Sequence, residues 1–171
     1  MELIKYPRTP HLSGSRLQPG QELYDDTWGE VVLMAGLPGT GKDTWIRENL
    51  PELPMISLDE VRKEIHILPR EPQGPVAAAA REKAREHLRR QESFVWNATN
   101  VTPSIREKQI RLFQAYHAAV RIVYLETEWK EQLRRNHSRE ETVPQEEIDR
   151  MMRNLVLPER FEAERVEWFC V

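Results

Sequence analysis

A short apolar run, followed at once by a glycine-rich turn and a helical stretch, constrains the fold of this chain more than any other feature. Residues 31–35 read Val-Val-Leu-Met-Ala, a composition typical of a buried strand. The segment from Gly36 to Lys42 fits the pattern G-x-x-x-x-G-K, and a helix is expected from Asp43 to Leu50. In this strand–loop–helix context the pattern predicts a phosphate-binding loop, whose backbone N–H groups and helix N-terminus surround a polyphosphate. The alternative is a glycine-rich turn that binds nothing.

Two residues of the loop bear on how a metal ion would be held. Lys42 is expected to reach the β- and γ-phosphates of a nucleoside triphosphate. The next position, where such loops usually carry a Mg²⁺-binding hydroxyl, holds Asp43, and a hydroxyl follows only at Thr44. The sequence therefore names both as candidate metal ligands. The predicted nucleotide-binding residues of the loop are Gly36, Leu37, Pro38, Gly39, Thr40, Gly41, Lys42, Asp43 and Thr44.

Length and composition agree with a single well-solvated α/β domain. The chain has 171 residues, of which 31% are charged, and a formal net charge of −3. That charge argues against a protein that coats nucleic acid through its overall field. Cys170 is the one cysteine, so no intramolecular disulfide is possible, and no apolar run approaches the roughly 18 residues of a membrane helix. We expect a cytoplasmic protein without a membrane partner, with residues 1–29 as an extended arm and 30–171 as the domain.

Strand-like and helix-like segments alternate along the chain. Further strands are expected at 55–58, 94–96 and 119–125, and helices at 59–67, 76–90, from 103 onward, at 128–136 and from a capping box at 142–145 to about 157. This order predicts a parallel sheet of four or five strands with helices on both faces. Ligands of such folds bind at the carboxyl ends of the strands.

A carboxylate and an arginine follow the second expected strand. Asp59 comes directly after it, where a carboxylate would accept the proton of an attacking hydroxyl. Arg62 lies three residues on, so it shares a helix face with Asp59 and would keep it ionised. The alternative is that Asp59 only caps the helix.

Two polar segments follow the third and fourth strands. The third strand ends in Asn97-Ala98-Thr99-Asn100 rather than in the acidic residue that often holds Mg²⁺, which favours substrate positioning or a simple polar turn. The segment 134–139 reads Arg-Arg-Asn-His-Ser-Arg. Arginines there would close over a nucleotide as a lid, or would form only a solvated basic surface.

With these motifs in order, the chain resembles the 5′-hydroxyl polynucleotide kinase domains of nucleic-acid repair systems, from about Val31 to Pro158. The resemblance includes Trp45 after the loop and the Thr99-Asn100 pair, and Asp43 and Ala98 are departures from the phage-type members. It implies a P-loop kinase fold with an arginine-bearing lid. The implied catalytic residues are Lys42, Asp59, Arg62 and Arg139; Arg135 and Arg139 would contact the nucleotide, and Asp59, Arg62, Thr99 and Asn100 the acceptor.

The resemblance also implies ATP and Mg²⁺ as cofactors. The expected partners are a nucleoside triphosphate, a nucleic acid with a 5′-OH end, and RNA ligase or phosphatase companions in repair. Two alternatives stay open: a kinase of the same fold that acts on a sugar or nucleoside hydroxyl, and a non-catalytic nucleotide-binding module.

Overall fold

A single parallel sheet organises the computed structural model, which describes residues 26–138 and 142–171. Within these residues it has five strands, β1 (Glu30–Ala35), β2 (Met55–Ser57), β3 (Phe94–Asn97), β4 (Ala119–Glu126) and β5 (Arg165–Cys170). Their order in the sheet is β2-β3-β1-β4-β5, and every neighbouring pair is parallel. Because β1 lies at the centre, the segment that follows it leaves the middle of the carboxyl edge.

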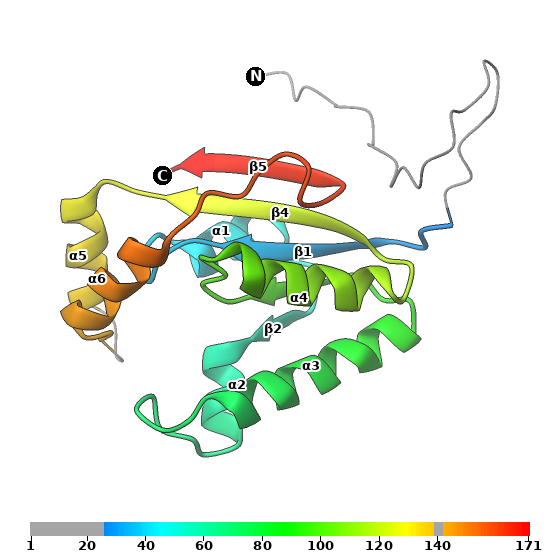
Figure 1. Ribbon diagram of the computed structural model, residues 1–171, viewed down its shortest axis with the longest axis horizontal. Coiled ribbons are helices and arrows are strands. Elements are labelled where there is room, and N and C mark those ends of the chain that lie inside the picture. The colour runs from blue at the N-terminus through cyan, green and yellow to red at the C-terminus, as the bar shows by residue number, and fades with distance from the viewer. Residues whose placement is uncertain (1–25, 139–141) are drawn as a thin grey trace.

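Six helices in the described residues connect and cover the strands. They are α1 (Lys42–Asn49), α2 (Leu58–Glu64), α3 (Gly74–Arg89), α4 (Pro103–Gln114), α5 (Trp129–His137) and α6 (Gln145–Asn154). Helices α3 and α4 cover one face and α1 the other, while α5 and α6 lie beyond the carboxyl end of β4 (Figure 1). The predicted α/β fold with helices on both faces is confirmed. None of the described helices has the length and apolar character needed to cross a membrane.

The two sheet faces bury cores of different size. The larger core joins alternate residues of β1 and β4 to α3 and α4, and includes the aromatic contact of Phe94 with Phe113, whose ring centroids are 5.5 Å apart. The smaller core packs Trp45 and Ile46 of α1 onto the opposite face, where Trp45 meets Phe169 of β5 at 5.4 Å. The two cores together fix strands β1 and β3, and the glycine-rich loop and the segment from Asn97 to Asn100 lie at the ends of these strands.

Two elements differ from the expected ones. The sequence pattern does not single out strand β5, because it is a short edge strand in which the charged Arg165 and Glu167 interrupt the apolar side chains. Helix α6 begins at Gln145 after Pro144, with no side-chain cap, so the capping box expected from residue 142 is wrong. The helix also ends at Asn154 rather than near 157.

Candidate functional site

The glycine-rich loop curls back over its own lysine. Gly36, Gly39 and Gly41 all have positive φ, at 139°, 83° and 89°, in the region that favours glycine. At Gly36 a Cβ would lie 2.4 Å from the carbonyl oxygen of Leu125, so the close approach of β4 adds a second reason for glycine. The Lys42 ammonium donates to the carbonyls of Gly36 and Leu37, at 2.8 Å each. The loop therefore has the curled backbone and the placed cation that the pattern predicts.

The segment after β3 is tied to the start of this loop. The Gly36 N–H donates to the carbonyl of Thr99 at 2.8 Å, and the buried Asn100 side chain donates to the carbonyl of Met34 at 2.7 Å. Asn100 itself has φ 45°, a conformation that asparagine tolerates better than most residues. These bonds give Thr99 and Asn100 a place beside the loop, and their predicted contacts with an acceptor stay predictions.

Asp43 and Asn97 meet across the space between α1 and β3. The Asn97 amide donates to Oδ1 of Asp43 at 2.6 Å, although the two residues are 54 positions apart. Asn97 is buried while Asp43 is exposed, so the amide is the fixed partner. Mg²⁺ bound with a nucleotide usually takes one or two protein carboxylates, and phosphates and waters complete its shell. An Asp43 carboxylate oriented by a buried amide fits that requirement; no cluster of three His, Cys, Asp or Glu side chains exists in the described residues.

The predicted pairing of Asp59 with Arg62 is confirmed. Arg62 Nη1 lies 2.6 Å from Oδ1 of Asp59, in the first turns of α2. The N-cap of α2 is Ser57, so Asp59 is not the capping residue of this helix. The Nε of Arg62 donates to Oε1 of Gln73 at 2.8 Å, a partner that was not predicted. Gln73 is thereby linked to Asp59 through one guanidinium.

Helix α5 packs directly on the glycine-rich loop. The buried Gln132 amide donates to the carbonyl of Pro38 at 3.0 Å, and a Cβ on Gly39 would lie 2.7 Å from the carbonyl oxygen of Gln132. Near Gly41, Nη1 of Arg135 would lie 3.1 Å from an added Cβ. The structure thus brings Arg135 to the loop, where its predicted role with the nucleotide stays a prediction.

Arg135 shares a carboxylate with its neighbour. Arg134 and Arg135 both bond to Glu131 at 2.7 Å. These hydrogen bonds, first from Arg134 and then from Arg135, lower the pKa of Glu131 to about 2. Glu131 is therefore ionised at neutral pH, and a phosphate that engages Arg135 competes with it. Arg139, the other predicted arginine, lies outside the described residues, so its role stays a prediction.

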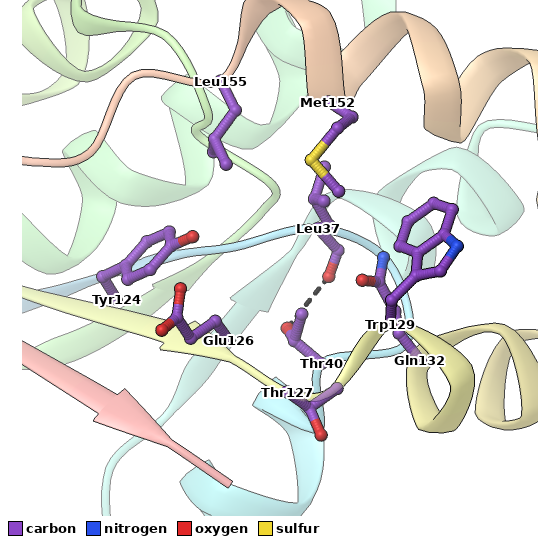
Figure 2. Close-up of a pocket in the computed structure, with 9 residues that line it drawn as sticks. All are labelled: Leu37, Thr40, Tyr124, Glu126, Thr127, Trp129, Gln132, Met152 and Leu155. Carbon is purple, nitrogen blue, oxygen red and sulfur yellow. Dashed lines mark hydrogen bonds between the residues drawn. The ribbon is translucent and has the colours of Figure 1, made fainter.

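A cavity of about 120 Å³ lies behind the loop, between the end of β4, α5 and α6 (Figure 2). Its lining, within the described part of the chain, is Leu37, Thr40, Tyr124, Glu126, Thr127, Trp129, Gln132, Met152 and Leu155. The Thr40 hydroxyl donates to the carbonyl of Leu37 at 2.9 Å, so this side chain braces the loop from within. Burial, reinforced by the neighbouring Glu126 carboxylate, raises the pKa of Tyr124.

Several contacts of the site could not be read from the sequence. Gln73 directly before α3 and Gln132 in α5 belong to no motif, and their partners lie 11 and 94 residues away along the chain. The one signal for Asn97 was its position at the end of a buried strand. Their contacts become visible only once the helices and strand ends are placed around the loop.

The family assignment follows from a match over most of the chain. The sequence model of the AAA_33 family, described as an AAA domain, matches residues 31–158. The chain belongs to this family. A search of curated protein sequences finds no match.

Solved structures with the same fold include several kinases. A provisionally assigned kinase from Chloroflexus aurantiacus is 16% identical, with a TM-score of 0.66 over 85% of this chain and 86% of that one. A chain of the Pnkp1/Rnl/Hen1 RNA repair complex is 15% identical, with a TM-score of 0.67 over 75% of this chain and 44% of that one, so this chain spans less than half of its length. A gluconokinase from Sinorhizobium meliloti is 18% identical, with a TM-score of 0.58 over 85% and 84%. The fold of this AAA_33 domain is the P-loop kinase fold.

Proposed function

We propose that this chain is an ATP-dependent kinase that transfers the γ-phosphoryl group to the 5′-hydroxyl end of RNA or DNA. The observation that carries the proposal is the Asp59–Arg62 pair at the carboxyl end of β2, on the sheet edge that also carries the phosphate-binding loop. The Asp59 side chain is 54% exposed. A base open to solvent suits a hydroxyl that stays attached to a long polymer, because the polymer need not enter an enclosed pocket.

The proposed reaction uses the residues in separate roles. Asp59 accepts the proton of the 5′-hydroxyl while the oxygen of that hydroxyl bonds to the γ-phosphorus. At the same time the bond from the γ-phosphorus to the β,γ-bridging oxygen breaks. The products are ADP and a 5′-phosphorylated end. Lys42 and the arginines 135 and 139 neutralise charge on the phosphates, and Arg62 orients Asp59. Asp43 would hold a Mg²⁺ ion, whose charge would screen that of the phosphates.

The proposal of a nucleic acid rather than a small alcohol as acceptor rests on the order of the motifs, because kinases of this fold differ in their acceptors. The neighbour from the RNA repair complex supports a nucleic-acid acceptor, and the order of motifs along the chain resembles that of polynucleotide kinases. The gluconokinase neighbour has the same fold and a different acceptor. Small alcohols therefore belong in any test of the proposal.

The acceptor is tested by radiolabel transfer from [γ-³²P]ATP in the presence of Mg²⁺. The panel contains 5′-OH RNA, 5′-OH DNA, the same oligonucleotides with a 5′-phosphate, nucleosides and gluconate. We expect label on the 5′-OH oligonucleotides alone. Label on a small alcohol without label on any oligonucleotide contradicts the proposal, and ATP binding without transfer to any acceptor favours a non-catalytic module.

The first prediction concerns the proposed base. Replacing Asp59 with Asn removes the proton acceptor but keeps the size of the side chain, so we expect transfer to fall about 10²- to 10⁴-fold while ATP binding changes little. Glu60→Gln, one residue on and also exposed in the first turn of α2, is the matched control and should leave transfer near the wild-type rate. Comparable losses in both variants, or loss of ATP binding by Asp59→Asn, would reassign Asp59 to a structural role.

A further inference from the structure

We infer that the metal-binding pair of this loop is inverted, so that Asp43 on the loop supplies the carboxylate and Asn97 on β3 supplies the neutral partner. In P-loop proteins that hydrolyse or transfer phosphate, the position after the lysine carries a hydroxyl, and the acidic residue that helps to hold Mg²⁺ comes from a neighbouring strand. Here the carboxylate stands at the first of these positions and the neutral side chain at a strand end. The inference rests on the proposed function only in that the loop binds a nucleotide with its metal.

The contact between the two side chains shows that they serve one location. Asn97 Nδ2 lies 2.6 Å from Oδ1 of Asp43, across the gap between the start of α1 and the end of β3. In P-loop proteins with the usual arrangement, the residue after the lysine and the acidic residue at the strand end both help to hold one metal ion. The direct hydrogen bond between Asn97 and Asp43 therefore puts the Asp43 carboxylate where the usual pair of ligands converges.

Burial decides which side chain orients the other. Asn97 is 6% exposed and its amide nitrogen also lies 3.5 Å from the sulfur of Met55. The buried position of Asn97 at the end of β3 restrains its amide. The amide nitrogen, not the amide oxygen, faces Asp43, so the Asp43 carboxylate accepts a hydrogen bond from it. The hydrogen bond at Oδ1 restrains the rotation of the carboxylate, so that Oδ2 would be the oxygen to bind a cation. Hydrogen bonds from neighbouring residues orient metal ligands in the same way in other proteins.

Thr44 offers the competing explanation, because its hydroxyl is the nearest one after the lysine. Its Oγ1 accepts a hydrogen bond from Nη2 of Arg47 at 3.3 Å, on an exposed part of α1. The Thr44 hydroxyl therefore bonds to a cationic side chain of its own helix. The Asp43 carboxylate bonds instead to Asn97 at the end of β3, and this geometry favours Asp43 over Thr44 as the ligand of the metal ion.

A carboxylate in this position has a consequence that a hydroxyl does not have. Without a metal ion, its negative charge faces the phosphates and opposes nucleotide binding. With Mg²⁺ bound, the same charge becomes favourable. Nucleotide and metal should therefore bind with strong positive coupling, and by linkage each should raise the affinity of the other by the same factor.

The experiment for the second prediction measures that coupling without turnover. The affinity of the full chain for a fluorescent ADP derivative is titrated in EDTA and in saturating Mg²⁺, and the ratio of the two dissociation constants is the coupling. For Asp43→Asn we expect tighter binding in EDTA, weaker binding in Mg²⁺, and a coupling reduced by about tenfold or more. Glu48→Gln removes the same charge from an exposed position at the far end of α1 and should leave the ratio unchanged.

Two further variants keep the inference falsifiable if Asp43→Asn folds poorly. Asn97→Asp adds a second carboxylate beside the first and should weaken binding in EDTA while increasing the coupling. The double change of Asp43→Ser with Asn97→Asp restores the usual order of the two groups and should recover a coupling close to the wild-type value. Far-ultraviolet circular dichroism checks that each variant is folded.

Three outcomes would overturn the inference. In the first, Thr44→Val abolishes the coupling while Asp43→Asn keeps it, which assigns the metal to the hydroxyl. An unchanged coupling in both variants would leave Asp43 as a favourable charge at a helix N-terminus. A failure of the double change to recover the coupling contradicts the inverted pair. Because ADP binding needs no acceptor, these results are independent of whether the acceptor is a nucleic acid.

Discussion

At the scale of single residues, the proposed base depends on a chain of side chains that reaches into a loop. Asp59 is held by Arg62, and Arg62 Nε donates to Gln73. The amide nitrogen of Gln73 in turn donates to the carbonyls of Leu68 and Glu71, at 3.0 and 2.7 Å. The loop between α2 and α3 therefore orients the carboxylate through two side chains, those of Gln73 and Arg62.

This network makes Gln73 a positioning residue, and its replacement gives the third prediction. In Gln73→Ala the guanidinium of Arg62 loses its second anchor, so we expect kcat for transfer to fall by about tenfold to a hundredfold with little change in the KM for ATP. Gln73→Glu keeps an oxygen that accepts from Arg62 and should retain more of the rate than Gln73→Ala. Equal kcat in the alanine variant and the wild type would show that the loop does not orient the pair.

At the scale of elements, helix α5 and the glycine-rich loop act as one packed unit. The helix donates a hydrogen bond from Gln132 to the loop carbonyl of Pro38, and its backbone lies against Gly39. The same helix carries Arg134 and Arg135, both bonded to Glu131. Any movement that brings Arg135 to a bound nucleotide therefore starts from a helix already docked on the phosphate-binding loop.

The docking of α5 gives the fourth prediction. Gly39→Ala combines a φ of 83°, which costs an L-residue roughly 1–2 kcal/mol, with a Cβ only 2.7 Å from the carbonyl oxygen of Gln132. We expect a lower midpoint of thermal unfolding and weaker ATP binding, because helix or loop must shift. Gly74→Ala at the start of α3 is the control: apart from its chain neighbours its Cβ meets nothing within 4 Å, so only the following Pro75 disfavours it and it should lower stability less than Gly39→Ala. Equal stability of the two variants would contradict the packing described.

At the scale of the whole molecule, one buried arginine joins the carboxyl edge of the sheet to the C-terminal segment. Arg106 of α4 is fully buried and pairs with Glu162 through two hydrogen bonds, at 2.6 and 2.7 Å. Its remaining nitrogen donates to the carbonyls of Asn100 and Val156. The segment after β3, which borders the candidate site, is thereby held against the segment that leads to β5.

The fifth prediction is that loss of this arginine destabilises the entire domain. Arg106→Ala removes both guanidinium donors of the Glu162 carboxylate and the donor of two carbonyls, and breaking a buried pair costs about 3–5 kcal/mol. Arg111→Ala on the same helix removes an arginine that is 77% exposed and pairs with Glu107, so it should cost less than about 1 kcal/mol. Urea unfolding of both variants measures the difference, and similar free energies of unfolding would contradict a structural role for Arg106.

Features that depend on neighbours along the chain can be predicted from the amino-acid sequence. The phosphate-binding loop, the alternation of strands and helices, and the pairing of Asp59 with Arg62 follow from spacing, because backbone geometry and helix periodicity relate residues a few positions apart. The placement of the candidate residues at strand ends follows from the rule that parallel strands share a carboxyl edge.

Contacts between segments far apart in the sequence emerge only in the folded domain. Asn97 meets Asp43, Gln132 meets Pro38, and Arg106 meets Glu162, at separations of 54, 94 and 56 residues. Such contacts depend on strand order and on how helices pack, which no local pattern records. The edge strand β5 belongs here too, since its pairing with β4 rather than its own composition makes it a strand. How Asp43 is oriented is thus a property of the folded sheet, while its presence in the loop is a property of the sequence.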